Sequence, residues 1–364
     1  MTSSATHDLD RPETYSSFDS SGIRERLRKL PVHCEDAWRV SQTVPLPADP
    51  PPVKHVVIGG MGGSAIAGDF TADLAATQGT VPISVVRDLK LPFALDHNSL
   101  FIACSYSGET RETLSMFHQA LAAGSQVIVI SSGGRLTEEA ESRGIPIFRV
   151  DAPGEPRNAT TYSLLLLLGI LHRLGIVRTG DEVVRASADD LRNRIAQLEE
   201  GVPTGDNPAK LLAAELKDKL ILVYGGGLFT GMARRWKTQF NENAKVWAFF
   251  ETIPELLHNS VESFGTAQEL GENLMVLLLQ PSVPDGGANA HFQVASQHLD
   301  GNGVPNRILQ GETANPLSQL LTMLLLGDYV SYYLAMLRGV DPSATPTLQA
   351  AKEDLAGLLT KDEV

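Results

Sequence analysis

The sequence is poor in the residue types that build disulfide frameworks, cysteine-rich metal sites and nucleic-acid-binding surfaces. Its only cysteines are Cys34 and Cys104, which are too few for such a framework and fit a reducing compartment. Lysine and arginine number 30 against 43 aspartates and glutamates, and the net charge of −13 argues against nucleic acid as a partner. A small phosphorylated ligand remains compatible with this charge, because a few local donors can hold it.

Long hydrophobic runs are also missing. The most apolar stretches, 164–168 and 320–326, are far shorter than the roughly 20 residues of a membrane span, so they predict buried helices. Residues 1–5 lack the basic-then-apolar pattern of a secretory signal. These features predict a cytoplasmic protein that does not use a membrane as a partner.

Short strand-like runs alternate with helical patterns along both halves of the chain. Continuous apolar strands separated by helices predict an α/β fold, with mostly parallel sheets flanked by helices on both faces. The predicted strands are 56–58, 83–86, 100–103, 127–130 and 145–148 in the first half, and 220–224, 246–250, 274–279 and 306–309 in the second.

Both halves open on the same kind of glycine-rich turn. The segment 58–67, IGGMGGSAIA, aligns without gaps with 224–233, YGGGLFTGMA, and this alignment pairs Ser64 with Thr230. Because the order of strands and helices also repeats, we infer two tandem domains of similar topology.

The predicted organisation has three parts. A polar segment, a helix and a proline-rich connector occupy 1–52, and a first domain with linker helices occupies 53–200. The loop 201–208 is dense in helix-breaking residues, and a second domain with C-terminal helices follows over 208–364. Residues 1 to about 20 are expected to be mobile, and 22–42 to form one helix.

The stretch Cys104–Thr110, CSYSGET, is the most informative in the chain. It follows the apolar run 99–103 and places the hydroxyls of Ser105, Ser107 and Thr110 around one glycine in a strand-to-helix turn. Such a turn offers hydroxyl groups and the free N–H groups of a helix start to an anion. Helix capping explains one hydroxyl, but three around one glycine favour a phosphate site.

The glycine turn allows three interpretations. Residues 60–65, GMGGSA, fit the dinucleotide fingerprint G-x-G-x-x-A, so an NAD(P)-dependent oxidoreductase is one alternative. A second is that the glycines only permit close packing of strand and helix. The third is a phosphate held between the turns after the first and third strands, with Ser64 on one side. The three hydroxyls after the third strand favour this last interpretation.

Gly62-Gly63-Ser64 followed by the hydroxyl-rich turn resembles the phosphate site of sugar isomerase (SIS) domains. Two tandem copies, with the motifs below, resemble the bifunctional phosphoglucose/phosphomannose isomerases from about residue 20 onward. The resemblance implies a homodimeric intramolecular oxidoreductase without cofactor or metal. It would interconvert fructose 6-phosphate with glucose 6-phosphate and mannose 6-phosphate through a cis-enediol. The residues implied to hold the substrate phosphate are Gly63, Ser64, Ser105, Ser107 and Thr110.

Isomerisation needs a base that reaches both C1 and C2 and a cation near the enediolate oxygen. The segment 241–245, NENAK, resembles the family signature N-E-N-x-K, which implies that Glu242 is this base. Arg157 matches the family's P-R-A motif, apart from Asn158, and is implied to be the cation. Without the resemblance, both residues read as ordinary helix charges.

Three more residues have implied roles. His258, in PELLHNS, resembles a family histidine that opens the sugar ring from the partner subunit, although Leu257 and Ser260 depart from the family pattern. Lys352 resembles a C-terminal lysine that joins ring opening, and Thr345 falls where the bifunctional enzymes carry a threonine beside the substrate. That threonine implies use of both C2 epimers.

Two features depart from the family or weigh against it. Glu109 stands where an asparagine is common, and we expect it to face solvent, away from the phosphate. After its third strand the second domain has Gln280-Pro281-Ser282 instead of the hydroxyl turn, so one phosphate site per chain is expected.

A non-catalytic sugar-phosphate sensor is the other alternative. The lack of a basic helix-turn-helix in 1–50 and the joint presence of base, cation, histidine and lysine favour the enzyme.

Overall fold

Two parallel sheets form the framework of the computed structural model, which describes residues 8–47, 51–78, 81–152, 154–282 and 288–359. The first sheet has the order β2-β1-β3-β4-β5 and the second β7-β6-β8-β9. The first sheet contains β1 (His55–Gly60), β2 (Ile83–Val86), β3 (Ser99–Ser105), β4 (Gln126–Ser131) and β5 (Ile147–Arg149). The second contains β6 (Leu220–Gly226), β7 (Ala248–Ile253), β8 (Leu274–Gln280) and β9 (Asn306–Gln310). The predicted α/β class is confirmed.

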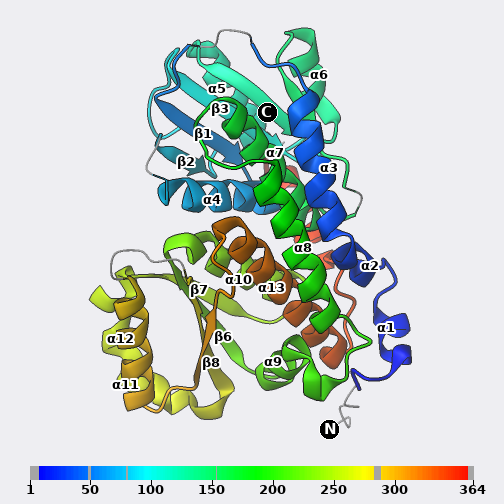
Figure 1. The fold of residues 1–364 in the computed structure, drawn as a ribbon, viewed down its shortest axis with the longest axis vertical. Coiled ribbons are helices and arrows are strands. Elements are labelled where there is room, and N and C mark those ends of the chain that lie inside the picture. Colours follow the sequence, from blue (N-terminus) through cyan, green and yellow to red (C-terminus); the bar gives the residue numbers. More distant parts are fainter. Residues whose placement is uncertain (1–7, 48–50, 79–80, 153, 283–287, 360–364) are drawn as a thin grey trace.

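Helices surround both sheets and fill the space between them (Figure 1). The α-helices are α1 (Pro12–Phe18), α2 (Ile23–Arg28), α3 (Leu30–Thr43), α4 (Gly62–Ala76), α5 (Arg111–Ala122), α6 (Gly134–Ser142), α7 (Thr160–Arg173), α8 (Asp181–Leu198), α9 (Pro208–Leu216), α10 (Thr230–Glu242), α11 (Phe264–Ala267), α12 (Ala288–Gly301), α13 (Pro316–Arg338) and α14 (Pro346–Leu359). The 3₁₀ turns used below are η1 (Pro156–Ala159), η3 (Gly227–Phe229) and η4 (Glu255–His258).

The two sheets share one topology. In each, the first strand of the repeat lies between the second and the third, so the strand order reverses at the pairs β1–β3 and β6–β8. All pairings are parallel. The first strands are followed by α4 and α10, which pack against each other between the sheets (Figure 1). This arrangement supports the inference of a duplicated unit.

The two apolar runs form buried helices, as predicted. Residues 164–168 are fully buried in α7, and residues 320–326 are buried in α13. In the described part of the chain, α13 is the one helix long and apolar enough to cross a membrane, but 94% of that stretch is buried inside the protein. It packs against α8, α9 and α10 and serves as a core helix.

The N-terminal region differs from the prediction. The expected helix over 22–42 is two helices, α2 and α3, separated at Lys29, and Pro31 lies in the first turn of α3, where its missing N–H is tolerated. The expectation of mobility is wrong for residues 8–20. Tyr15 of α1 is buried, donates a hydrogen bond to the carbonyl of Leu9 and stacks on Tyr332 of α13. Residues 1–7 and 48–50 lie outside the described ranges.

Two strands begin later than their apolar runs predicted. β7 starts at Ala248 instead of 246, because the N–H of Val246 donates to the carbonyl of Phe240 and closes the end of α10. β5 starts at Ile147 instead of 145, because the N–H of Ile145 closes the end of α6 in the same way. In both cases an apolar residue finishes a helix before the strand begins.

Candidate active site

Two turns meet at the carboxyl edge of the first sheet, at the point where its strand order reverses. β1 and β3 pair in register with Gly60 opposite Cys104, and each strand leads into a helix, α4 or α5. A Cβ at Gly60 would lie 2.7 Å from the carbonyl oxygen of Cys104, so glycine is required there. The crevice outside such strand ends is the usual ligand site of open α/β sheets.

The glycine turn presents the amino end of α4. The helix begins at Gly62, which has φ of +52°, and Gly63 and Ser64 follow in its first turn. Amide groups in a first helical turn have no partner inside the helix and are free to bind an anion. A Cβ at Gly63 would lie 3.0 Å from the carbonyl oxygen of Pro156. The turn therefore lies against η1, the segment that carries Arg157.

The hydroxyl turn after β3 is tightly organised. The hydroxyls of Ser105 and Thr110 are hydrogen-bonded to each other at 2.9 Å, and Ser105 Oγ also accepts the N–H of Gly108. Thr110 is the N-cap residue of α5, yet within the described chain its side chain makes no capping hydrogen bond. Ser107 is exposed and its hydroxyl accepts the N–H of Glu109. Capping thus does not account for these hydroxyls.

Glu109 faces solvent, as expected, and has a partner that the sequence did not reveal. Its carboxylate accepts the N–H of Arg135 at 2.7 Å, in the first turn of α6. The positive end of a helix dipole favours a carboxylate in this place. Gly108, with φ of +72°, brings this turn so close to α6 that a Cβ would lie 1.8 Å from the carbonyl oxygen of Gly133.

The equivalent turn of the second repeat carries large apolar residues. Leu228 and Phe229, both buried in η3, occupy the positions that align with Gly62 and Gly63. The hydroxyl of Thr230, which aligns with Ser64, donates to the carbonyl of Gly227 at 2.9 Å. Two large apolar residues therefore replace the two glycines of the first repeat, which supports one phosphate site per chain.

Arg157 is a buried cation, 6% exposed, on η1. Its Nε donates to Asn243 Oδ1 at 2.9 Å, and NH2 donates to the carbonyls of Pro342 and Ser343 at 2.7 and 3.0 Å. Burial lowers the pKa of Arg157, and the carboxylates of Glu242 and Glu155 oppose this shift. Arginine has such a high ordinary pKa that the group stays charged at neutral pH.

Glu242 meets Arg157 at the end of α10. Its carboxylate oxygen Oε2 lies 3.5 Å from NH1 of Arg157, and its side chain is 32% exposed. The prediction that Glu242 lies near the end of the helix is confirmed. The partly exposed Glu242 carboxylate and the buried Arg157 guanidinium thus lie together beside the glycine turn.

A buried polar network between α10 and α13 fixes the position of Arg157. Arg235 of α10 donates to the backbone carbonyl of Arg157 at 2.9 Å and forms a two-pronged ion pair with Asp328 of α13. Asn243, which accepts from Arg157, in turn donates to Ser331 Oγ at 3.0 Å. Burial raises the pKa of Asp328, and the Arg235 guanidinium opposes the rise. Sequence motifs did not reveal these partners, although Asn243 stands inside the NENAK segment.

Lys245, the last residue of that segment, is also part of the site. Its ammonium donates to the carbonyls of Glu242 and Asp341 at 2.6 and 2.8 Å and more weakly to that of Asn243 at 3.3 Å. Burial and the neighbouring Arg157 lower the pKa of Lys245 to about 8. The sequence alone assigned no role to Lys245.

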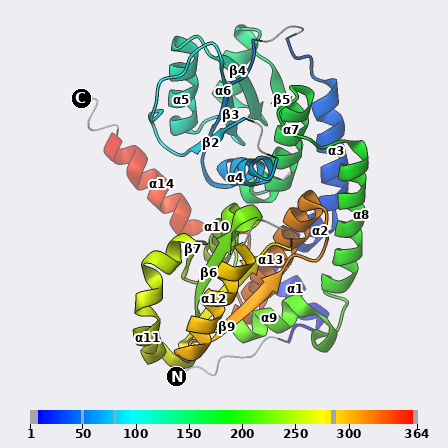
Figure 2. The same cartoon turned by 60° about the vertical axis from the view of Figure 1, so that its left-hand side comes forward.

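The other three predicted residues are not joined to Arg157 and Glu242. His258, at the end of η4, and Lys352, on α14, are exposed. Across the described ranges, no hydrogen bond or ion pair links either to Arg157 or Glu242. Thr345 stands in the segment between α13 and α14, two residues after Ser343, whose carbonyl holds Arg157. α14 stands out from the body of the molecule (Figure 2).

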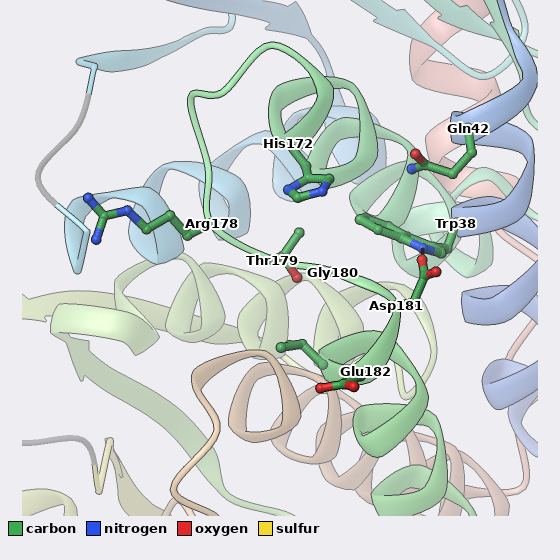
Figure 3. Close-up of a pocket in the computed structure, with 9 residues that line it drawn as sticks. Trp38, Gln42, His172, Arg178, Thr179, Gly180, Asp181 and Glu182 are labelled. Atoms are coloured by element: carbon green, nitrogen blue, oxygen red, sulfur yellow. Dashed lines mark hydrogen bonds between the residues drawn. The ribbon is translucent and has the colours of Figure 1, made fainter.

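A surface groove of about 650 Å³ lies away from these residues. It runs between α3, the end of α7 and the start of α8, where Trp38, His172 and Asp181 come together (Figure 3). The indole N–H of Trp38 donates to Asp181 at 2.7 Å. None of the residues named above for the two turns or for the Arg157–Glu242 pair lines this groove.

Comparisons with known proteins point to one family. A model described as the bacterial phospho-glucose isomerase C-terminal SIS domain matches residues 205–355. The bifunctional phosphoglucose/phosphomannose isomerase of Caldicellulosiruptor bescii is 32% identical over 91% of this chain and 98% of that protein. That of Aquifex aeolicus is 33% identical over 84% of this chain and 91% of that protein. The structure of a glucose-6-phosphate isomerase like protein from Thermus thermophilus shares the fold, with a TM-score of 0.63, 24% identity and coverage of 95% of this chain and 99% of that one.

Proposed function

The chain belongs to the family of bifunctional phosphoglucose/phosphomannose isomerases, and we propose that it interconverts fructose 6-phosphate with glucose 6-phosphate and mannose 6-phosphate. One proton moves between C1 and C2 through a cis-enediol(ate). One carbon is oxidised as the other is reduced, so the reaction balances as an intramolecular oxidation and reduction without an external electron acceptor.

The substrate phosphate binds between the two turns of the first domain. Gly63 and Ser64 contribute helix-terminal amides and a hydroxyl, and Ser105, Ser107 and Thr110 contribute hydroxyls from the neighbouring strand end. Support comes from the pairing of Gly60 with Cys104, which places both turns at one edge of the sheet. Hydrogen bonds to a charged group are among the stronger ones in proteins, so this set suits a phosphate dianion.

Glu242 is the base and Arg157 the cation. The carboxylate takes a proton from C1 of the open-chain ketose, the C1–H electrons form the C1=C2 bond, and negative charge develops on the C2 oxygen. Arg157 stabilises that charge. Glu242 then returns its proton to C2, and the C1=C2 electrons form the new C2–H bond. The C1 hydroxyl proton passes to the C2 oxygen, which leaves a C2 hydroxyl and the C1 aldehyde. The contact of the buried Arg157 with the partly open Glu242, at 3.5 Å beside Gly63, is the observation that carries the proposal.

The remaining roles complete the cycle in a homodimer. We assign ring opening to His258 of the partner subunit together with Lys352, and we place Thr345 beside the sugar carbons. The exposed positions of His258 and Lys352 leave both side chains accessible to a second copy of the chain. Return of the proton to one face of C2 gives glucose 6-phosphate, and return to the other gives mannose 6-phosphate.

A coupled assay tests the proposal. Purified protein is incubated with fructose 6-phosphate, or separately with mannose 6-phosphate, and glucose 6-phosphate is detected with its dehydrogenase. Turnover of both substrates is expected. Binding of either sugar phosphate without turnover would favour the non-catalytic sensor. Tight binding of NAD(P)H by the protein itself, without isomerisation, would favour the oxidoreductase.

A further inference from the structure

Lys245 has a backbone conformation that is unusual for its residue type. It lies three residues beyond the end of α10 and has φ of +55°, in the left-handed region that glycine enters more easily than any other residue. Backbone strain of this kind is concentrated at functional sites, where the surrounding contacts hold it in place.

The Lys245 ammonium bonds two parts of the chain together. Two of its three carbonyl partners, on Glu242 and Asn243, belong to the end of α10, where carbonyl groups lack partners inside the helix. The third, on Asp341, belongs to the segment that follows α13. Its three N–H groups are thus directed at carbonyl oxygens, and it has no hydrogen left for a substrate.

Arg157 binds the same segment from the other side. Its NH2 group donates to the carbonyls of Pro342 and Ser343, directly after the Asp341 carbonyl that Lys245 holds. Two cations therefore hold three consecutive carbonyl groups, at 341–343. Arg157 is hydrogen-bonded to this segment directly, and the Glu242 backbone is connected to it through Lys245. The positions of the Arg157 guanidinium and the Glu242 backbone therefore depend on each other.

We propose that Lys245 is a positioning residue, whose ammonium ties the Glu242 backbone to the 341–343 segment and thereby keeps the Glu242 carboxylate in register with Arg157. The inference rests on the proposed isomerase function. Lys245 acts through Glu242 and Arg157 and does not touch the substrate.

The electrostatics around Lys245 add a pH dependence. The charged groups that face it are Arg157 from η1, Glu242 from α10 and Asp341 from the segment after α13. Burial and Arg157 lower its pKa to about 8, and Asp341 and Glu242 oppose the shift. Loss of the proton removes the charge and one of three N–H donors, so kcat is expected to fall as the pH rises through about 8.

The test compares Lys245→Gly with Asp218→Gly. Glycine relieves the backbone strain at both positions, since Asp218 has φ of +64°, but only the first variant removes the ammonium. For Lys245→Gly we expect an unchanged circular dichroism spectrum, a fall in kcat of about ten-fold or more, and a KM changed by less than about two-fold. The alkaline limb near pH 8 should disappear, and added methylammonium should restore part of kcat. Asp218→Gly should match the wild type.

The outcomes separate the inference from the proposed function. If the wild type turns over and folded Lys245→Gly keeps the same kcat and pH profile, the inference alone is overturned. It is also overturned if Lys245→Gly has a raised KM at unchanged kcat. Absence of wild-type turnover overturns the proposed function and this inference with it. If Lys245→Gly does not fold, Lys245→Gln is measured in its place, and the same losses in kcat and in the alkaline limb are required of it.

Discussion

Arg157 is fixed by structural hydrogen bonds and is also the proposed cation. Nε and both hydrogens of NH2 are used on Asn243, Pro342 and Ser343, so three of the five N–H groups fix the guanidinium in place. The NH1 group remains, directed at Glu242. A cation held in this way needs little reorganisation when negative charge develops beside it, which is what an enediolate requires.

Replacement of the proposed base is the sharpest test at the residue scale. Glu242→Gln keeps the shape of the side chain but removes its ability to take a proton from carbon. We expect kcat to fall by about 10²–10⁴-fold, with KM for fructose 6-phosphate little changed. Steady-state kinetics measure both. Glu138→Gln, on the exposed face of α6, is the matched control and should retain full activity; full activity in Glu242→Gln would refute the assignment.

The hydroxyl turn after β3 makes a different prediction. Ser105→Ala removes a buried hydroxyl that bonds Thr110 and the Gly108 amide. A hydrogen bond to a charged group contributes about 1.5–3 kcal/mol, so KM and the inhibition constant of inorganic phosphate should rise together by about 10–100-fold. Ser142→Ala on α6 changes an exposed hydroxyl far along the chain and serves as control. Unchanged phosphate inhibition in Ser105→Ala would place the phosphate elsewhere.

At the scale of elements, the contact of α4 with α10 joins the glycine turn to Glu242, the proposed base. The N–H of Gly231 in α10 donates to Asp73 Oδ2 of α4 at 2.7 Å, and a Cβ at Gly231 would lie 2.6 Å from Cβ of Asp69. The two helices therefore need a glycine where they cross. One helix begins at the glycine turn and the other ends at Glu242, so their contact sets the distance between the proposed phosphate site and the proposed base.

Asp73 makes this contact sensitive to pH. Burial raises its pKa to about 8, while the Gly231 N–H and Arg234 oppose the rise. A carboxyl with a raised folded-state pKa binds its proton more tightly when folded, so the stability it contributes falls as the pH rises from about 4 to about 8. Asp73→Asn keeps an oxygen acceptor for Gly231 and does not ionise. We expect its Tm, relative to wild type, to be higher at about pH 8 than at about pH 5.

Thermal unfolding at the two pH values measures this difference. Asp206→Asn, at an exposed aspartate, is the control and should show no pH-dependent gain. An Asp73→Asn variant whose Tm follows that of the wild type at both pH values would show that the carboxyl is not destabilised by its site.

The elements were more predictable than their ends and their contacts. Apolar runs predicted all nine strands of the described chain, because burial on both sides of a parallel sheet demands such runs. They misplaced the start of β7, because the backbone N–H of Val246 closes the end of α10. Sequence motifs predicted Arg157 and Glu242 as site residues, but they did not predict that the carbonyls of Pro342 and Ser343 bind Arg157. A backbone carbonyl has no side-chain signature, and these partners lie 185 and 186 residues from Arg157.

At the scale of the whole molecule, the two repeats differ in the residues they bring to the proposed site. The first has Gly63 in its glycine turn and carries the hydroxyl turn, whereas the second has Phe229 in place of Gly63. The second supplies Glu242 and, at its end, α14, whose residues 346–358 are exposed. His258 is also exposed, which agrees with the proposal that the site is completed by a second subunit.

Mixed dimers test that proposal. Glu242→Gln and His258→Ala should each lose activity alone. If the histidine comes from the partner, a mixed dimer restores one complete site, and an equal mixture after subunit exchange should recover about a quarter of wild-type activity. Each variant taken through the same exchange alone is the control. No recovery, with exchange verified by mass, would place His258 in the site of its own chain.

Proton transfer through an enediol is the central claim, and nuclear magnetic resonance of fructose 6-phosphate incubated with the protein in D₂O tests it most directly. A proton held by a carboxylate exchanges with solvent. The account predicts glucose 6-phosphate and mannose 6-phosphate that carry deuterium at C2, without any added cofactor. Failure to form either aldose, or aldoses with only protium at C2, would contradict it.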